Sequence, residues 1–251
     1  FGESDDGTLY YAMEYLEGYD LKQLVDLDGP LHVARTIRVL EQIAGALAEA
    51  HDKGLVHRDI KPPNIILCEV DGVPDVAKLL DFGLVSPMAQ SPRRLTVEGH
   101  VIGTPRYVAP EMLRAKGELS AATDFYALGL VAYFLLSGRH AFEAETTAEI
   151  LKKQRNDPPQ ALTDLAPEVP SDVASVVHWC LEKDPAKRPA NGRALQEALA
   201  SCADADRWDV DLARAWWDEY REGPAQSPPA QPGSVTAPEG PSAKERNQPP
   251  S

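Results

Sequence analysis

The sequence predicts an α+β fold in which a few short strands precede a body made mainly of helices. Three runs rich in aromatic or aliphatic residues, at 8–16, 64–69 and 76–80, have the composition of strands and lie in the first third of the chain. Helical signals dominate the rest, most clearly the nearly uninterrupted apolar stretch 121–137. At 251 residues the chain is long enough to bury a full core.

Glycines and periodicity set the boundaries of the first elements. We expect Gly18 to end the first strand and a short helix to cover 20–27. Between 32 and 53 the apolar residues recur every 3.6 positions, which predicts an amphipathic helix, and Gly54 stands where a C-cap glycine is common. A turn at Asp71-Gly72 is expected to join the next two strands.

The second half is expected to be helical after a long loop over 84–110, where no periodicity is visible. The stretch 121–137 is so apolar that we expect a helix buried on all sides. With 17 residues and Asp124 near its start, it suits a protein core better than a bilayer. Prolines punctuate the predicted helices at 146–155, 171–183 and 191–202, and a last amphipathic helix is predicted around 209–221.

Composition excludes several classes of partner and site. With 39 acidic against 25 basic residues the net charge is −14, which argues against nucleic acid and anionic membranes as main partners. Cys68, Cys180 and Cys202 are too far apart for a zinc site or a disulfide framework, and we expect buried thiols. No apolar run reaches the ~18 residues of a membrane span, and no signal peptide is visible. Because the first residue is Phe1, we expect a fragment of a longer product.

The stretch His-Arg-Asp-Ile-Lys-Pro-Pro-Asn at 57–64 concentrates polar groups that phosphoryl transfer needs, and an Asp-Phe-Gly follows it at Asp81. Asp59 can orient a substrate hydroxyl, and Lys61 can meet a phosphate. Asn64 and Asp81 offer an amide oxygen and a carboxylate, which suit Mg²⁺.

These residues stand in a wider pattern. An Ala-Pro-Glu that ends at Glu111, Asp124 followed by Gly129, and Arg188 occur in the order of one family and near its spacings. The chain therefore resembles the eukaryotic-type protein kinases, in particular the bacterial serine/threonine branch, over about residues 1–203. The resemblance implies a protein-kinase-like fold: a mainly helical carboxy-terminal lobe with a residual strand of the amino-terminal lobe and hinge.

The resemblance assigns the reaction chemistry. It makes Asp59 the catalytic aspartate and Lys61 the lysine that contacts the transferring phosphate in the serine/threonine branch. Asn64 and Asp81 match the two magnesium ligands. They are 17 positions apart, slightly more than in the family, and we expect the extra residues around 69–75 to lengthen a hairpin turn.

Five other residues resemble structural parts of such a site. Glu111 and Arg188 resemble the buried ion pair that pins the substrate-binding loop to the helical core. Asp124 resembles the helix aspartate that accepts hydrogen bonds from the catalytic-loop backbone. His57 and Phe82 resemble the lower half of the apolar column that aligns the two lobes.

Regulation is also implied by the resemblance. Arg58, which precedes the catalytic aspartate, is typical of enzymes switched by phosphorylation of the activation loop, since an arginine can bind the new phosphate. We favour Thr96 as the phosphorylated residue. Thr104 resembles the threonine that bonds to the catalytic aspartate and lysine, a second sign of the serine/threonine branch.

A nucleotide pocket is implied by the likeness of residues 8–21 to the hinge. The backbone of Glu14 and Leu16 would bond the adenine, and Asp20 would lie near the ribose or a basic substrate side chain. Ile66 would form the floor of the pocket. A plain edge strand and turn is the alternative for this segment.

The resemblance divides the chain into the end of the amino-terminal lobe with the hinge (1–19), the carboxy-terminal lobe (20–203), a helical extension (204–222) and a proline-rich tail expected to be disordered (223–251). No Gly-x-Gly-x-x-Gly loop occurs, so the sequence resembles a kinase cut just before the hinge. We expect little activity from this polypeptide alone, because nothing would cover the phosphates.

We therefore expect a protein serine/threonine kinase that uses ATP and Mg²⁺ to phosphorylate Ser or Thr hydroxyls of proteins. The alternative is a non-catalytic pseudokinase or docking module, and the Ala-Pro-Glu segment disfavours a small-molecule phosphotransferase. The tail could bind a partner. A cytoplasmic location is expected, and a membrane tether would require a longer parent chain.

Overall fold

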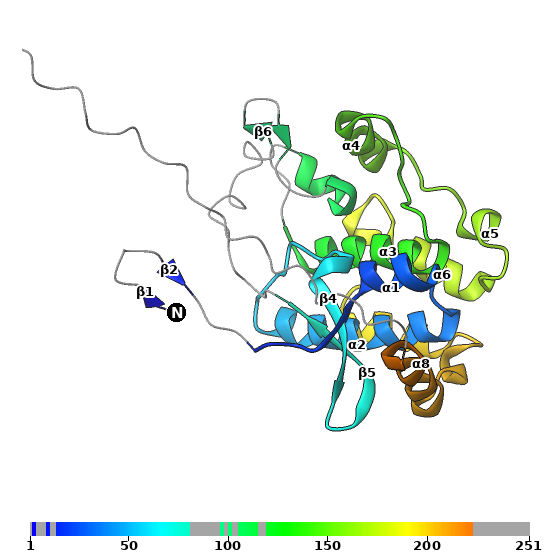
Figure 1. The fold of residues 1–251 in the computed structure, drawn as a ribbon. Helices are drawn as coiled ribbons and strands as arrows, with labels where there is room; N and C mark the ends of the chain where they lie inside the picture. The colour runs from blue at the N-terminus through cyan, green and yellow to red at the C-terminus, as the bar shows by residue number, and fades with distance from the viewer. Residues whose placement is uncertain are drawn as a thin grey trace, which may run out of the picture.

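The computed structural model describes residues 2–3, 9–10, 14–80, 96–97, 100–101, 105–114 and 119–222. It confirms the α+β class, with a helical body and one three-stranded antiparallel sheet beside it (Figure 1). Most of the loop expected at 84–110 and the whole tail 223–251 lie outside the described residues. The helices are α1 (Leu21–Asp28), α2 (Val33–Asp52), α3 (Ala121–Ser137), α4 (Thr147–Asn156), α5 (Leu162–Leu165), α6 (Ser171–Cys180), α7 (Gly192–Ala200) and α8 (Val210–Glu222). Short 3-10 turns are η1 (Pro62–Asn64), η4 (Pro105–Tyr107), η5 (Pro110–Leu113), η6 (Pro185–Lys187) and η7 (Ala205–Arg207).

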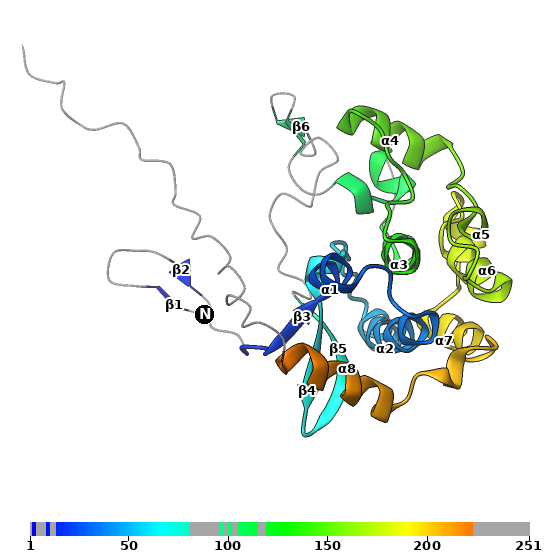
Figure 2. The same ribbon diagram turned by 45° about the vertical axis from the view of Figure 1, so that its right-hand side comes forward.

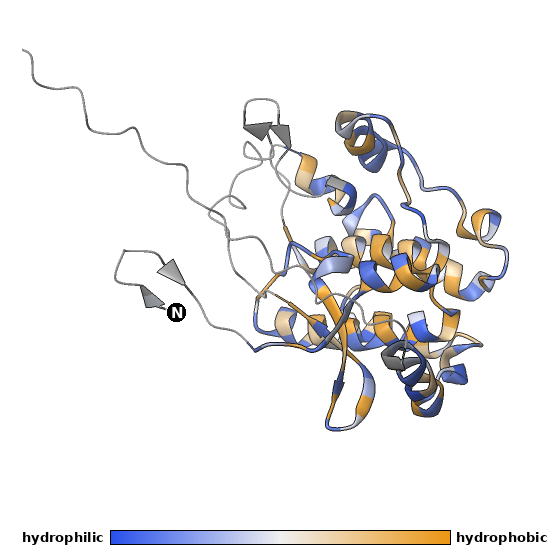
Figure 3. Cartoon of the chain, viewed as in Figure 1, coloured by the Kyte–Doolittle hydropathy of each residue, from blue (hydrophilic) through white to orange (hydrophobic). Residues whose placement is uncertain are grey.

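Helix α3 forms the centre of the helical body. It packs on α2 and α6, and α2 packs in turn on α7 (Figure 2). Every residue from Thr123 to Leu136 is buried, which confirms the predicted all-round burial, and the helix is largely apolar in Figure 3. None of the helices in the described part of the chain has the length and apolarity needed to cross a membrane.

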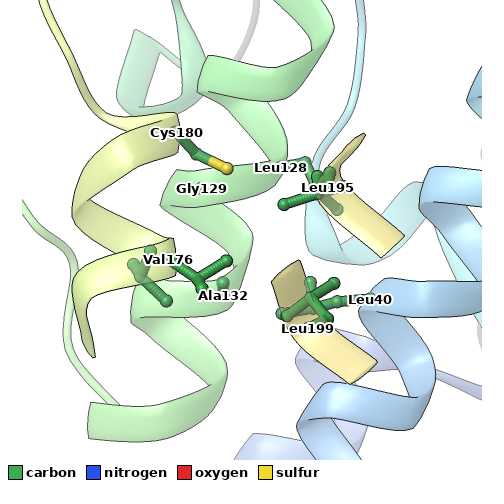
Figure 4. A pocket seen from close by; sticks show the side chains of 9 residues that line it. Leu40, Leu128, Gly129, Ala132, Val176, Cys180, Leu195 and Leu199 are labelled. Carbon is green, nitrogen blue, oxygen red and sulfur yellow. The ribbon is translucent and has the colours of Figure 1, made fainter. Parts of the chain in front are cut away.

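A small apolar cavity lies where four of these helices meet. Leu40 of α2, Ala132 of α3, Cys180 of α6 and Leu199 of α7 are among its lining residues (Figure 4). At about 10 Å³ it is at the lower limit for one water molecule, and its apolar walls offer that water no hydrogen-bond partner. It is therefore a packing feature. All three cysteines are buried free thiols, as predicted.

The main sheet has the order β3 (Gly18–Asp20), β4 (Ile65–Val70), β5 (Val73–Leu79). One expectation was wrong here, because residues 14–17 have no regular structure and Gly18 begins a strand instead of ending one. A Cβ at Gly18 would lie 2.1 Å from the carbonyl oxygen of Leu67, so the glycine permits close pairing with β4. Two-residue strands also pair as β1 (Gly2–Glu3) with β2 (Leu9–Tyr10) and as β6 (Thr96–Val97) with β7 (His100–Val101).

Helix starts follow the local sequence. Asp20 is the N-cap of α1 and forms a capping box with Gln23, each side chain bonding to the backbone of the other residue. The predicted turn at Asp71-Gly72 is confirmed, and both residues adopt left-handed backbone angles. Gly54, with φ of 73°, follows the end of α2 as expected.

Candidate active site

The candidate site lies in the loop that leads from α2 into η1. Lys61 donates from Nζ to Oδ2 of Asp59 at 2.8 Å, and Asn64 donates from Nδ2 to the same oxygen at 2.9 Å. The Asp59 side chain is still 64% exposed. A carboxylate that is held from one side and open on the other can accept a hydrogen bond from an incoming hydroxyl.

Asn64 is fixed by three hydrogen bonds besides the one to the Asp59 carboxylate. Its Nδ2 also donates to the Asp59 carbonyl, its backbone N–H donates to the carbonyl of Lys61, and its own carbonyl accepts from the N–H of Leu80. Because Nδ2 is directed at Asp59, Oδ1 of Asn64 faces away from that carboxylate. The amide oxygen is therefore oriented to serve as a ligand for a hard cation.

Asp124, near the start of α3, holds the backbone of this loop. Its carboxylate accepts from the N–H of His57 and the N–H of Arg58, both at 2.8 Å, and from Nε2 of His51 at 2.8 Å. Arg58 has a φ of 70°, in the left-handed region that non-glycine residues rarely adopt. The two bonds from successive N–H groups stabilise this uncommon backbone conformation just before Asp59.

His57 connects the loop to the end of β5. Its buried ring donates from Nε2 to the carbonyl of Leu80 at 2.7 Å and accepts at Nδ1 from the N–H of Asp59 at 3.3 Å. Leu80 is thus bonded to His57 through its carbonyl and to Asn64 through its N–H. Asp81, the next residue, and Phe82 lie outside the described residues.

Glu111 and Arg188 form a buried bidentate ion pair, with Nη1 at 2.8 Å from Oε1 and Nη2 at 2.9 Å from Oε2. Thr123 donates to Oε1 of Glu111 at 3.0 Å, and the Arg188 guanidinium lies 4.7 Å from the ring centre of Tyr126. Burial opposes ionisation of Glu111, but the hydrogen bonds and charge of Arg188 outweigh it, and the net effect lowers the pKa of Glu111. The pair joins η5 to the residue that follows η6.

The four residues assigned to a nucleotide pocket are only partly brought together. Asp20 and Ile66 are paired across β3 and β4, and the Asp20 carboxyl caps α1. Burial raises the pKa of Asp20 although the backbone of Gln23 opposes this. Leu16 lies in the irregular segment before β3, and the exposed carboxylate of Glu14 bonds Lys78 of β5 at 2.9 Å.

Of the three residues assigned to regulation, the structure describes Arg58 and the backbone of Thr96. Arg58 is exposed next to Asp59. The backbone of Thr96 pairs with Val101 in the β6–β7 hairpin, and Thr104 lies outside the described residues.

Two buried polar groups, one at the site and one beside the main sheet, had no strong signal in the sequence. His51 bonds Asp124, and its position six residues before His57 in the last turn of α2 was the only clue. Asp75 is a fully buried carboxylate that pairs with Arg35 from 40 residues away. Sequence inspection placed it in a lengthened turn.

Known proteins share this sequence and fold. A family model described as "Protein kinase domain" matches residues 3–200. The chain is 35% identical over 217 residues to the serine/threonine-protein kinase pkn3 of Myxococcus xanthus, covering 85% of this chain and 39% of that protein. It is 35% identical over 206 residues to the serine/threonine-protein kinase PrkC of Bacillus subtilis, covering 82% of this chain and 31% of that protein. The chain thus spans well under half the length of these relatives.

A solved structure with a similar fold is that of Rad53 residues 1–466 in complex with AMP-PNP. It aligns with a TM-score of 0.60 and 26% identity over 74% of this chain and 45% of that one. The alignment supports the kinase-like fold expected from the sequence.

Proposed function

The chain belongs to the family of protein kinase domains, and on that premise we propose that it carries the acceptor and magnesium side of a protein serine/threonine kinase site. The observation that carries the proposal is the hydrogen-bonded group of Asp59, Lys61 and Asn64. These three side chains are the ones that phosphoryl transfer to a hydroxyl requires on this side. A docking module would have no need to keep all three in contact.

Asp59 would accept the hydrogen bond of a Ser or Thr hydroxyl and hold its oxygen in line with the phosphorus. Because Lys61 and Asn64 already fix one carboxylate oxygen, little reorientation is needed when the substrate arrives. Nζ of Lys61, 2.8 Å from that oxygen, would also stabilise negative charge on the transferred group. Protein segments with Ser or Thr are the proposed substrates.

ATP and Mg²⁺ are the proposed cofactors. Bound together they would supply the γ-phosphoryl group and neutralise its charge. Oδ1 of Asn64 and the carboxylate of Asp81 have the chemistry of magnesium ligands. The AMP-PNP complex of the similar Rad53 structure supports ATP as the nucleotide.

The proposed nucleotide side combines the hinge and the edge of the main sheet. The backbone at Glu14 and Leu16 would bond the adenine, Ile66 would form the pocket floor, and Asp20 would face the ribose. The pairing of Asp20 with Ile66 supports the last two assignments together. Regulation through Arg58 and a phosphorylated Thr96 belongs to the same proposal.

The test uses the full-frame polypeptide, by which we mean the longest open reading frame that contains these 251 residues. Incubated with γ-labelled ATP, Mg²⁺ and casein, it should label serine or threonine, and Asp81→Asn should abolish the label. Label on tyrosine, or none at all from a folded preparation, would overturn the proposal.

We further propose that the 251-residue polypeptide alone transfers phosphate poorly, since its sequence has no glycine-rich loop to shield the phosphates.

A further inference from the structure

Asp75 lies at a β-bulge in β5. Between the pairs Cys68–Val76 and Val70–Val73, one residue of β4 faces two residues of β5, and Asp75 adopts a left-handed φ of 57°. Two consecutive side chains of β5 are buried as a result. Bulges redirect side chains, and this one turns the Asp75 carboxylate toward α2 and α8.

The carboxylate of Asp75 is saturated by donors from two distant segments. Oδ1 accepts from Nη2 of Arg35 at 2.7 Å and from Nε1 of Trp217 at 2.8 Å. Oδ2 accepts from Nε of Arg35 at 2.9 Å and from Nε1 of Trp208 at 2.8 Å. These bonds fill the four acceptor positions that a carboxylate offers.

The two indole donors belong to residues 204–222, here called the strap. Within the strap, Trp216 bonds Asp28 at the end of α1 through Nε1 at 3.0 Å. The Arg35 guanidinium lies 4.0 Å from the ring centre of Trp216 and 5.1 Å from that of Trp208. Figures 1 and 2 both show α8 beside the main sheet, consistent with its contacts to β5.

The strap also contacts the strand that follows the hinge. The rings of Trp217 and Trp216 lie 5.6 Å and 6.2 Å from the ring of Tyr19, the central residue of β3. Asp20, assigned to the ribose, comes next in the chain. The strap therefore contacts β3 through Tyr19, and through Asp75 it contacts β5, which leads to Asp81.

We propose that the strap positions the nucleotide side of the site, and that Asp75 is the positioning residue through which it acts. The inference rests on the proposed function, because it concerns ATP at that same site. Asp75 orients Trp217, Trp217 packs on Tyr19, and Tyr19 fixes β3 next to Asp20. Removing the indole donor while keeping an aromatic ring should loosen β3 and β5 and leave the distant α3 unchanged.

The first experiment measures amide hydrogen exchange in the 251-residue chain. Trp217→Phe should make exchange in β3 and β5 roughly tenfold faster, which is what the loss of one hydrogen bond to a charged carboxylate gives. Exchange in α3 should not change. Trp179→Phe is the matched control, because the same substitution is made in α6, away from the strap. Asp75→Asn should give a larger effect with the same distribution.

The second experiment measures ATP kinetics of the full-frame polypeptide. Trp217→Phe should raise KM for ATP about three- to tenfold with kcat within about twofold, the pattern of lost ground-state binding. Equal acceleration of exchange in α3 and β3, or unchanged KM and exchange, would overturn the inference. If wild type transferred no phosphate, the proposed function would fail separately, and exchange in β3 would still decide whether the strap holds that strand.

Discussion

Asp59 and Asp124 have opposite environments, and the difference fits different roles. Asp124 is buried and accepts three hydrogen bonds, from the backbone of His57 and Arg58 and from the side chain of His51. Its loss would leave backbone donors without partners. Asp59 is largely exposed, and in the described part of the chain its carboxylate accepts from Lys61 and Asn64 of the same segment, which leaves the other side of the group open.

Asp59→Asn should lower phosphate transfer by the full-frame polypeptide by about 10²–10⁴-fold, the usual contribution of a general base. Because the side chain is 64% exposed, the free energy of unfolding should change by less than ~0.5 kcal/mol. Asp52→Asn is the control, since it makes the same change at a site 65% exposed, in a surface pair with Arg193. Equal activity of the two variants would contradict the assignment. Activity assays and urea unfolding give the two measurements.

Glu111→Gln should destabilise the chain by roughly 3–5 kcal/mol at neutral pH, because it leaves Arg188 buried without its counter-charge. The pKa of Glu111 is lowered in the folded chain, below its ordinary value of 4.5. Its contribution to stability is therefore present above pH 4.5 and is lost as the pH falls through the lower folded value.

The difference in unfolding free energy between wild type and Glu111→Gln should therefore shrink as urea titrations move from pH 7 to below pH 4. A difference that stayed constant with pH would show that the ion pair is not its source. Asp52→Asn again serves as control, since an exposed pair contributes about 0–1 kcal/mol.

At the scale of elements, α3 is the part on which the site depends most. Its first turn carries Asp124, and the carbonyl of Ala122 in that turn accepts from Nη1 of Arg188.

Close packing of α3 on α6 is possible because Gly129 has no side chain. A Cβ there would lie 2.7 Å from Cβ of Cys180 and 3.1 Å from Cδ2 of Leu181.

Gly129→Ala should therefore destabilise the chain by about 1–3 kcal/mol, because the two helices must move apart. Gly45→Ala in α2 is the matched control. There the new Cβ would meet only the flexible end of Gln196, and the gain in helix propensity offsets the contact, so the change should stay below ~1 kcal/mol. Urea unfolding of both variants tests this, and equal destabilisation would contradict the packing argument.

The helices could be predicted from the sequence because their signals are local. The 3.6-residue period gave α2, uninterrupted apolarity gave α3, and prolines marked the limits of later helices, each within a few residues. β3 was missed because a glycine such as Gly18 can either end a strand or lie within one where two backbones approach closely. Which one holds depends on Leu67, far along the chain.

The site, too, could be predicted only where its residues are close together in the sequence. Residues 57–64 adjoin in sequence, so a motif could identify Asp59, Lys61 and Asn64 together. The surroundings of Asp75 could not be found in this way. Its two indole donors lie 133 and 142 positions away, and its direction comes from a bulge that leaves no pattern in the sequence. The expectation of a lengthened turn was wrong: the turn covers only 71–72, and the extra residues extend the ends of β4 and β5, where Asp75 lies in the bulge.

At the scale of the whole molecule, the strap joins parts of the chain that are far apart in sequence. It reaches β3, α1, α2 and β5 from the carboxy-terminal side. Helix α8 has 13 residues, a length that is only marginally stable as an isolated helix in water. Its helicity therefore depends on docking, to which the hydrogen bond between Trp217 and the buried Asp75 contributes.

The strap should unfold together with the lobe in a single transition. Trp208, Trp216 and Trp217 are three of the four tryptophans, so in a Trp179→Phe background fluorescence reports the strap alone, while far-UV circular dichroism reports all helices. In urea the two midpoints should coincide, because losing the strap removes two of the four hydrogen-bond donors of the Asp75 carboxylate. Adding Trp217→Phe should separate them, with the fluorescence change at lower urea. A fluorescence transition that precedes circular dichroism already without Trp217→Phe would show that the strap is an independent, weakly held segment.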